Sequence, residues 1–267
     1  MQASIIVSYY KNLSNLEIIL HALNNQTTKN SFEVIVSEDD DNLSTKQFLN
    51  AIKSSLNYPI THISQKDEGF QKCKSLNSAV KISTSDFLIF IDGDCIPHKK
   101  FVANYLKSKK ANLVLFGRRV ILSETLSKKI IFKKEFSNLS LINLIKYKCK
   151  RIEDGIYFPV INKWIKKKKA SLLLGCNMGI NKTDLMRING FDEDYIFPGG
   201  GEDSDIEWRF KKIDGIKFKS MRFMAIVYHL YHVERFNKEQ EVERTEFMNK
   251  KINLGYFFCK NGLTKAS

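Results

Sequence analysis

The stretch FLIFIDGD, residues 87–94, decides the fold class of this chain. Its apolar run predicts a buried strand, which ends at Asp92 and Asp94. Asp-Gly-Asp is also an ordinary turn sequence, but its position directly after a buried strand favours a binding role. Two carboxylates this close repel each other unless a cation lies between them. We therefore expect a divalent cation that also holds phosphate at the end of this strand.

Upstream of that stretch, strand-like and helix-like segments alternate. Strands are predicted over residues 4–10, 32–37 and 60–63, and helices start at Ser14 or Asn15, run from Ser44 to Leu56, and run from Cys73 to Ile82. This order predicts an α/β fold with a mostly parallel, Rossmann-like sheet and helices on both faces. Ligands of such sheets bind at the carboxyl ends of the strands. A second acidic group, residues 38–41, follows another strand and is either a solvated loop or a nucleoside-binding group.

The rest of the chain gives shorter segments. They are a helix from Pro97 toward Lys107, strands over 112–117, 171–180 and 224–229, a capping box at Asn181–Asp184 before a short helix, and a charged helix from Glu234. Residues 123–169 are rich in lysine and in bulky apolar side chains. We interpret them as an insertion of one or two amphipathic helices.

The composition points to anionic partners and a reducing compartment. Lys and Arg number 43 against 29 Asp and Glu, a net charge of +14, which favours phosphorylated substrates, nucleic acid or an anionic membrane unless it reflects solvated faces alone. The five cysteines have no CxxC spacing and indicate neither a disulfide framework nor a zinc site. The N-terminus leaves no room for a signal peptide, and no apolar run approaches the ~20 residues of a transmembrane helix. Any membrane contact is therefore expected to be peripheral.

The stretch GGGEDSDIEWR, residues 199–209, is the most informative for chemistry. Glycine lets a backbone approach a ligand closely. Glu202 and Asp203 then open an amphipathic segment, and the dipole at a helix N-terminus favours their ionised form. A plain helix cap explains one acid, but not three glycines followed by Glu-Asp-Ser-Asp. We interpret this stretch as the place of a general base.

Two histidines, His229 and His232, lie three residues apart beside the last predicted strand. A lone histidine usually belongs to the packing or to the surface. A pair near a metal site indicates metal binding, because neutral imidazole is a good ligand for ions such as Mn²⁺.

With these segments together, the chain resembles the family 2 glycosyltransferases of the GT-A fold. It is most similar to transferases whose C-terminal half looks like the galactosyltransferase module of chondroitin-type polymerases, and to capsular and O-antigen sugar transferases. The matching segments are 4–10, Glu38-Asp39, 67–77, 86–97, 175–179, 190–193, 200–203 and 229–232. Each segment alone is a weak match to the family, but the order and spacing of all the segments together are specific to it.

The resemblance implies a role for each segment. Asp94 would coordinate Mn²⁺ or Mg²⁺ bridging the donor diphosphate, with His229 or His232 as a further ligand. Asp203 would be the catalytic base, and Glu202 would hold the acceptor. Where the family has a phosphate-contacting arginine, Lys74 or Lys72 stands in. The implied contacts to the nucleotide sugar are Ser8, Tyr10, Glu38 or Asp39, Gly69, Phe70, Lys74, Asn77, Asp92 at the ribose, Gly93, Gly200 and Gly201.

We expect four parts within one GT-A domain, of which the Lys-rich insertion has no clear counterpart in the family. Residues 1–120 would bind the donor, 121–170 would form a Lys-rich helical insertion that contacts acceptor or membrane, 171–233 would carry catalysis and the acceptor, and 234–267 would form a helical tail. The basic residues around Lys166–Lys169 either attract a lipid-diphosphate acceptor or membrane surface, or belong to a solvated helix face.

The implied function is inverting transfer of a sugar from a nucleotide donor, UDP-linked, to a hydroxyl of a glycan or lipid-linked acceptor in bacterial surface polysaccharide synthesis. The expected place is the cytoplasm, at the inner face of the cytoplasmic membrane. A metal-dependent nucleotidyltransferase also uses paired carboxylates, and a basic nucleic-acid-binding protein would account for the charge. Acidic strand ends argue against nucleic acid, and the Gly-Gly-Glu-Asp segment with the late histidine pair favours sugar transfer.

Overall fold

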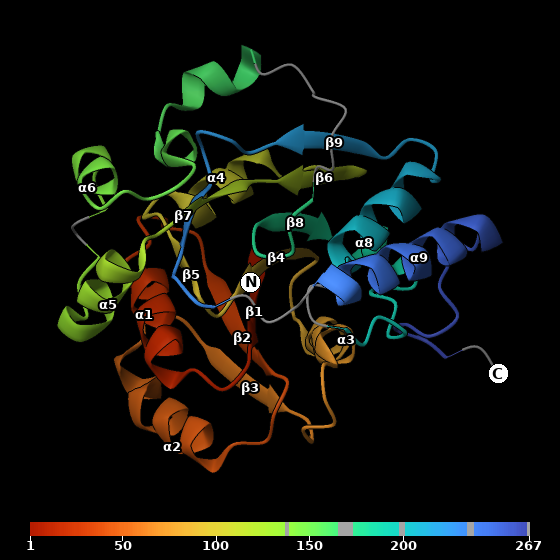
Figure 1. The fold of residues 1–267 in the computed structure, drawn as a ribbon, viewed down its shortest axis with the longest axis horizontal. Helices are drawn as coiled ribbons and strands as arrows, with labels where there is room; N and C mark the ends of the chain where they lie inside the picture. The colour runs from red at the N-terminus through yellow and green to blue at the C-terminus, as the bar shows by residue number, and fades with distance from the viewer. Residues whose placement is uncertain (137–138, 165–172, 198–200, 234–237, 266–267) are drawn as a thin grey trace.

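A computed structural model describes residues 1–136, 139–164, 173–197, 201–233 and 238–265. Its centre is a seven-stranded sheet in the order β3-β2-β1-β4-β8-β6-β9, with helices on both faces (Figure 1). The strands are β1 (Ala3–Tyr9), β2 (Phe32–Glu38), β3 (Ile60–Ser64), β4 (Phe87–Asp92), β6 (Leu113–Phe116), β8 (Met178–Asn181) and β9 (Lys217–Ser220). Strands β3, β2, β1 and β4 pair in parallel, as do β6 and β9. The predicted α/β fold with a mostly parallel sheet is confirmed.

Two cores form because successive side chains of a strand point to opposite faces of the sheet. Ile5 and Ile89 pack with helix α1 (Leu13–Asn24) on one face, whereas Ile6 and Leu88 pack with helix α3 (Lys72–Ile82) on the other. A strand that is buried on both faces has an unbroken apolar sequence, which is why residues 87–91 predicted a buried strand.

Asparagine side chains start the first two helices. Asn12 caps α1 by accepting a hydrogen bond from the Asn15 amide at 3.1 Å, so the predicted start at Ser14 or Asn15 is wrong. Asn42 caps α2 (Leu43–Ile52), and only a 3-10 turn, η1 (Lys53–Ser55), continues toward Leu56. The alternation of strands and helices that the sequence predicted is otherwise present.

A second sheet of three short strands was not predicted. It contains β5 (Cys95–Pro97), β10 (Ile226–His229) and β7 (Arg118–Ile121), with β10 in the middle. Pro97 pairs with Val227 in this sheet, so the predicted helix is present as α4 (Phe101–Ser108), but its predicted start at Pro97 is wrong. The sheet brings the end of β10 beside the turn that follows β4.

The Lys-rich insertion contains two helices, α5 (Glu124–Lys133) and α6 (Leu141–Lys146), and two 3-10 turns, η2 (Ile152–Gly155) and η3 (Pro159–Trp164). The prediction of one or two helices is confirmed there. Leu126, Ile130 and Leu144 are buried in the main core, so this segment is part of the domain. Residues 166–169, predicted either to contact acceptor or membrane or to belong to a solvated helix face, lie outside the described residues.

The C-terminal half adds β8, which runs antiparallel to both β4 and β6, and helices α7 (Lys182–Met186), α8 (Glu202–Lys211) and α9 (Lys238–Leu254). Asn177 bonds to the carbonyls of Arg118 and Ala225, so the strand predicted over 171–180 begins only at Met178. The predicted capping box is wrong, because Asn181 donates to Asp184 Oδ2 instead of accepting from the helix.

Among the helices of the described part of the chain, none combines the length and the apolar character that crossing a bilayer requires.

Candidate active site

The carboxyl ends of the parallel strands β1, β2 and β4 meet at one edge of the large sheet. Ser8 pairs with Asp92, and Tyr9 pairs with Glu38, in the strand register. The turn after β4 is held against β1, because the Gly93 amide donates to the Ser8 carbonyl at 2.7 Å. A Cβ at Gly93 would lie 3.1 Å from that carbonyl, so the position favours glycine. The turn thereby fixes where both aspartates point.

Asp94 and both histidines gather into one cluster. The Nε2 atoms of His229 and His232 lie 3.6 and 3.4 Å from Asp94 Oδ2. The ligand atoms of all three lie within 4.8 Å of one another. The pairing of β10 with β5 sets this geometry, since His229 is opposite Cys95 and the Leu230 amide donates to the Asp94 carbonyl at 2.8 Å. The sequence left open which histidine belongs here, and the structure brings both.

The chemistry of this cluster fits Mn²⁺ or Mg²⁺. Burial lowers the pKa of His229, so the ring stays neutral and keeps a lone pair for a cation. Two imidazoles and a carboxylate suit Mn²⁺ better than Mg²⁺, which prefers an all-oxygen shell. Three protein ligands also leave coordination positions open for a substrate.

Lys72, at the start of α3, joins the two acidic segments that the sequence singled out. Its Nζ lies 3.0 Å from Asp92 Oδ1 and 3.2 Å from Glu202 Oε1. Burial opposes the charge on Lys72, but the two carboxylates outweigh it and raise the lysine pKa. Burial likewise opposes the charge on Asp92, and the ammonium outweighs it and lowers the Asp92 pKa. Lys74, the other candidate, is exposed and does not reach this pair.

Asp203 is the second residue of α8, which begins directly after Gly201. The φ of Gly201 is 80°, a left-handed conformation that favours glycine. Asp203 Oδ2 accepts from the Gly175 amide at 3.3 Å, and Asp203 Oδ1 accepts from the Ser204 amide at 2.7 Å. Burial, and then the charge of Glu202, raise the Asp203 pKa to about 6. These effects exceed the helix dipole, which was expected to favour the ionised form. Gly200 lies outside the described residues.

Glu38 and Asp39, the two nucleoside candidates, have different surroundings. Glu38 is fully buried, with Oε1 accepting from Thr45 at 2.8 Å and Oε2 paired with His62 at 2.7 Å. Asp39 lies at the edge of the core and accepts hydrogen bonds from the loop that precedes α3. Both carboxylates are therefore engaged within the protein, and a nucleoside contact of Glu38 or Asp39 stays a prediction.

That loop carries the predicted Gly69 and Phe70. Asp67, which the sequence reading did not assign a role, accepts from Tyr10 at 3.3 Å and from the Gly69 amide at 3.3 Å. Gly69 has a φ of 85°, so the loop turns sharply there. Tyr10 and the 65–70 loop thus lie together beside the strand ends.

Asn77 is buried and holds the backbone together instead of facing this edge. Its Nδ2 donates to the Phe191 carbonyl at 2.8 Å and to Glu193 Oε1 at 2.9 Å, and its Oδ1 accepts from the Phe191 amide. The residue therefore fastens α3 to the loop after α7, and its predicted nucleotide contact has no support from this geometry.

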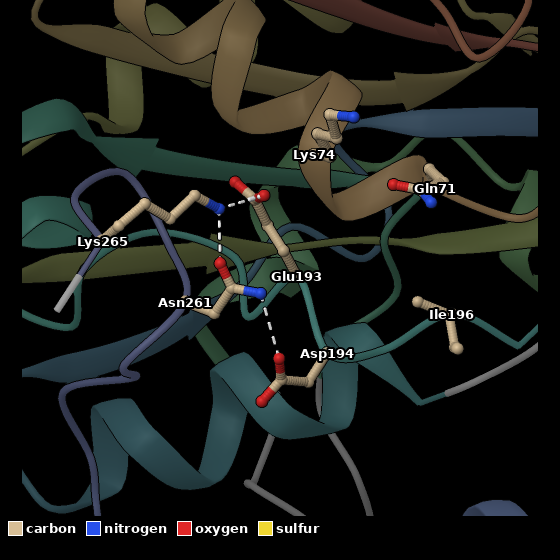
Figure 2. Close-up of a pocket in the computed structure, with 7 residues that line it drawn as sticks. All are labelled: Gln71, Lys74, Glu193, Asp194, Ile196, Asn261 and Lys265. Carbon is tan, nitrogen blue, oxygen red and sulfur yellow. Dashed lines mark hydrogen bonds and ion pairs between the residues drawn. The ribbon is translucent and has the colours of Figure 1, made fainter. Parts of the chain in front are cut away.

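A hollow of about 550 Å³ opens next to Gln71, one residue before Lys72 (Figure 2). Lys74 lines it from α3, and Glu193, Asp194 and Lys265 line the opposite side. The acidic groups are already engaged, since Glu193 pairs with Lys265, and Asp194 accepts from Asn261 at 3.0 Å. This hollow therefore lies next to the Lys72 ion pairs with Asp92 and Glu202 and does not contain them.

The comparisons with known proteins bear on this geometry. A sequence profile described as Glycosyl transferase family 2 matches residues 4–168, which include β1, the loop before α3 and the Asp92–Asp94 turn. The chain belongs to glycosyl transferase family 2. A second profile, described as the N-terminal domain of galactosyltransferase, matches residues 156–233, which contain Asp203 and both histidines. The predicted resemblance is confirmed in both halves.

Two curated relatives are polysaccharide synthases. Chondroitin synthase of Escherichia coli is 27% identical over 280 residues, covering 96% of this chain and 39% of that protein. Hyaluronan synthase of Pasteurella multocida is 27% identical over 277 residues, covering 94% of this chain and 26% of that protein. The family 2 chain thus spans well under half the length of these relatives.

Solved structures share the fold. GalNAc-T7 with UDP, GalNAc and Mn²⁺ superposes with a TM-score of 0.62 at 14% identity, covering 92% of this chain and 48% of that one. The mannosyltransferase PcManGT from Pyrobaculum calidifontis with GDP-Man and Mn²⁺ gives 0.64 at 14% identity, covering 95% and 64%. At such identities the likeness establishes the fold, and the predicted GT-A fold is confirmed.

Proposed function

We propose that this chain transfers a sugar from a nucleotide donor to a hydroxyl group of a glycan or lipid-linked acceptor, with inversion at the anomeric carbon. The observation that carries the proposal is the position of Lys72, which links Asp92 beside the metal-ligand cluster to Glu202 beside Asp203. A cation site for a leaving diphosphate and a carboxylate base thereby belong to one continuous site.

Asp94, His229 and His232 would hold Mn²⁺, which supplies charge neutralisation for the leaving diphosphate. Asp203 accepts the proton from the acceptor hydroxyl while the hydroxyl oxygen forms its bond to the anomeric carbon. The bond from that carbon to the diphosphate breaks, and its electron pair leaves with the diphosphate. A single displacement of this kind inverts the anomeric centre. Glu202, oriented by Lys72, holds the acceptor, and Asp39 and Asp92 contact the nucleoside.

UDP is the proposed nucleotide, and bacterial surface polysaccharide is the proposed product. The relatives named chondroitin synthase and hyaluronan synthase support a polysaccharide product. A structure of TarS from S. aureus in complex with UDP, with a TM-score of 0.55, and the GalNAc-T7 structure support UDP. The GDP-Man of the mannosyltransferase structure supports a different nucleotide, so the donor screen includes GDP-linked sugars.

The proposed place is the cytoplasm, at the inner face of the membrane, with α6 in contact with the lipid. Leu141, Ile142 and Ile145 of α6 are exposed, the last two by 78% and 61%. Ile142 and Ile145 are three residues apart, so they share one side of the helix. Lys146 and Lys148 follow them and are exposed as well. We call these five residues the α6 face, which combines apolar groups with charges that attract anionic lipid.

A screen of nucleotide sugars tests the proposal. The protein is incubated with UDP-, GDP- and CMP-linked sugars, with Mn²⁺ or with excess chelator, and release of the free nucleotide is measured. Hydrolysis or transfer with one donor, only when Mn²⁺ is present, is expected. A nucleotidyltransferase would release diphosphate from a nucleoside triphosphate instead, and binding of plain oligonucleotides without nucleotide-sugar turnover would favour the nucleic-acid-binding alternative.

A further inference from the structure

Arg119 of β7 was not singled out by the sequence, yet it lies on the same side of the small sheet as His229. In the parallel pairing of β7 with β10, Arg119 is opposite Val227, and Ile121 is opposite His229. Residues two apart on a strand share a face, and so do directly paired residues. The Arg119 side chain therefore belongs to the face that carries the metal-ligand cluster.

The guanidinium of Arg119 is partly buried, and among the described residues no carboxylate forms a direct ion pair with it. Within the described part of the chain, its side-chain hydrogen bond is from Nη1 to the Cys176 thiol, at 3.7 Å. A thiol is a weak hydrogen-bond acceptor and does not replace a carboxylate as the partner of a guanidinium. Two other sheltered arginines differ, because Arg209 bonds Asp205 at 2.7 Å and Arg222 bonds Asp154 at 2.6 Å. A cation sheltered from water costs free energy until an anion meets it.

The position of Arg119 limits which anion that is. On one side, its strand register places it on the face of the small sheet that carries His229. On its other side, Cys176 follows Gly175, whose amide donates to Asp203. The guanidinium thus lies between the cation cluster and the proposed base, where the reacting part of a donor belongs.

We propose that Arg119 binds an anionic oxygen of the nucleotide-sugar donor, between His229 and Asp203. This inference rests on the proposed function. A planar guanidinium donates two parallel hydrogen bonds to a phosphate or a carboxylate. The anion is the donor diphosphate or a carboxylate on the transferred sugar, which present the same pair of oxygens. Arg119 is a donor-binding residue and takes no proton in the reaction.

Nucleotide affinity of Arg119→Met, measured by calorimetry with Mn²⁺ present, tests the proposal. The probes are UDP, UMP, UDP-glucose and UDP-glucuronic acid. Loss of a charge-assisted contact is expected to weaken the affected ligand about 10- to 100-fold. Arg118→Met is the matched control, since Arg118 is on the same strand and faces the other side, over Phe116. Arg119→Lys, which keeps the charge but not the fork, should give an intermediate loss.

The pattern of losses identifies the anion. Weaker UDP with unchanged UMP assigns the contact to the diphosphate. Unchanged UDP with weaker UDP-glucuronic acid, but not UDP-glucose, assigns it to the sugar carboxylate. Unchanged affinity for all four probes overturns the inference, and so does an equal loss for all four, which would mean a general effect on the fold.

Mn²⁺ affinity without nucleotide gives an independent readout. Removing a cation near the cluster should leave Mn²⁺ affinity unchanged or raise it, because like charges repel. A loss of Mn²⁺ affinity in Arg119→Met would mean that Arg119 only supports the cluster, and the inference would fall. If the wild-type protein bound Mn²⁺ but none of the four nucleotides, the proposed function itself would fail.

Discussion

Asp203 shows how the site adjusts a single group. An ordinary aspartate is a poor proton acceptor near neutral pH because its pKa is about 4. Burial and the neighbouring Glu202 raise the Asp203 pKa to about 6, closer to the pH at which a general base works best. The residue remains ionised at neutral pH, so it combines useful basicity with the right protonation state.

The rate of transfer should therefore depend on pH through Asp203. Below pH 6 the carboxyl is protonated and cannot accept a proton, so kcat/KM for the acceptor should fall about tenfold per pH unit as the pH decreases. Above pH 7 Asp203 is almost fully ionised, so kcat/KM should no longer change with pH through this residue. The check is a profile of kcat/KM from pH 4.5 to 8 at saturating Mn²⁺ and donor. A rate that stays constant from pH 7 down to pH 5 would contradict this assignment.

Lys72 and Lys74 provide a matched pair of variants. Lys72→Met removes the cation that Asp92 and Glu202 share, so the two acids lose their common orientation. Transfer should slow about 10- to 100-fold, the scale of a lost charged hydrogen bond. Lys74→Met removes an exposed lysine from the same helix and should change the rate less than about threefold. The check is steady-state kinetics of both variants, with unfolding curves to exclude loss of the fold. An equal or larger loss of rate in Lys74→Met would contradict the prediction.

The sequence identified the acidic residues of the site better than its lysine and arginine. Asp92, Asp94, Glu202 and Asp203 follow recognisable apolar or glycine runs, and the structure brings them into one region. The choice between Lys72 and Lys74 depends on where α3 starts, because two residues along a helix turn the side chain to a different face. Arg119 gave no signal, since its meaning depends on a pairing with β10 that is far away in the sequence.

At the scale of elements, long buried strands were predictable and short ones were not. Strands β1, β2 and β4 have six or seven residues, each around an unbroken apolar run of three to five. Strand β5 has three residues and β7 has four, two of them arginine, which gives no strand period. These strands are nevertheless the ones that place the histidines beside Asp94. The sequence therefore predicted the strand that ends at Asp92 and both histidines, and it missed the small sheet that brings the histidines beside Asp94.

The α6 face yields a prediction about membranes. Replacing both Ile142 and Ile145 by Gln should leave the fold intact, because both are exposed, while binding to anionic vesicles falls about tenfold or more. The control is Met186→Gln, another exposed apolar residue, on α7. Sedimentation with vesicles at low and high salt measures the effect. Equal binding by the wild type and the double variant would leave α6 as a solvated helix.

At the scale of the whole molecule, distant segments meet at one edge of the sheet. The profile match over residues 4–168 includes the Asp92–Asp94 turn, and the match over 156–233 includes Asp203 and the histidines. The strand β8, which crosses antiparallel between β4 and β6, joins the two parts into one sheet. Reading the order of strands along the sequence cannot reveal such a crossing, since β8 has only four residues.

The assembled cluster predicts dependence on a divalent cation. Excess chelator should abolish turnover, and Mn²⁺ should restore it better than Mg²⁺, because imidazole ligands suit Mn²⁺. Asp94→Ala should lose Mn²⁺ affinity and keep its thermal unfolding temperature, since its removal relieves repulsion from Asp92. Mn²⁺ titration and thermal unfolding of the variant measure both. Full turnover in chelator would exclude a metal-dependent reaction.

The central claim is that Asp203 is the base of a sugar transfer whose donor is held elsewhere. The most direct measurement is the transfer rate of Asp203→Asn beside its affinity for UDP. The account predicts a rate about 10²–10⁴-fold lower, because asparagine keeps the shape but accepts no proton, with UDP affinity within about threefold of the wild type. Glu202→Gln is the matched variant and should chiefly raise the acceptor KM. A fully active Asp203→Asn enzyme, or one that loses UDP affinity and keeps its rate at saturation, would contradict the account.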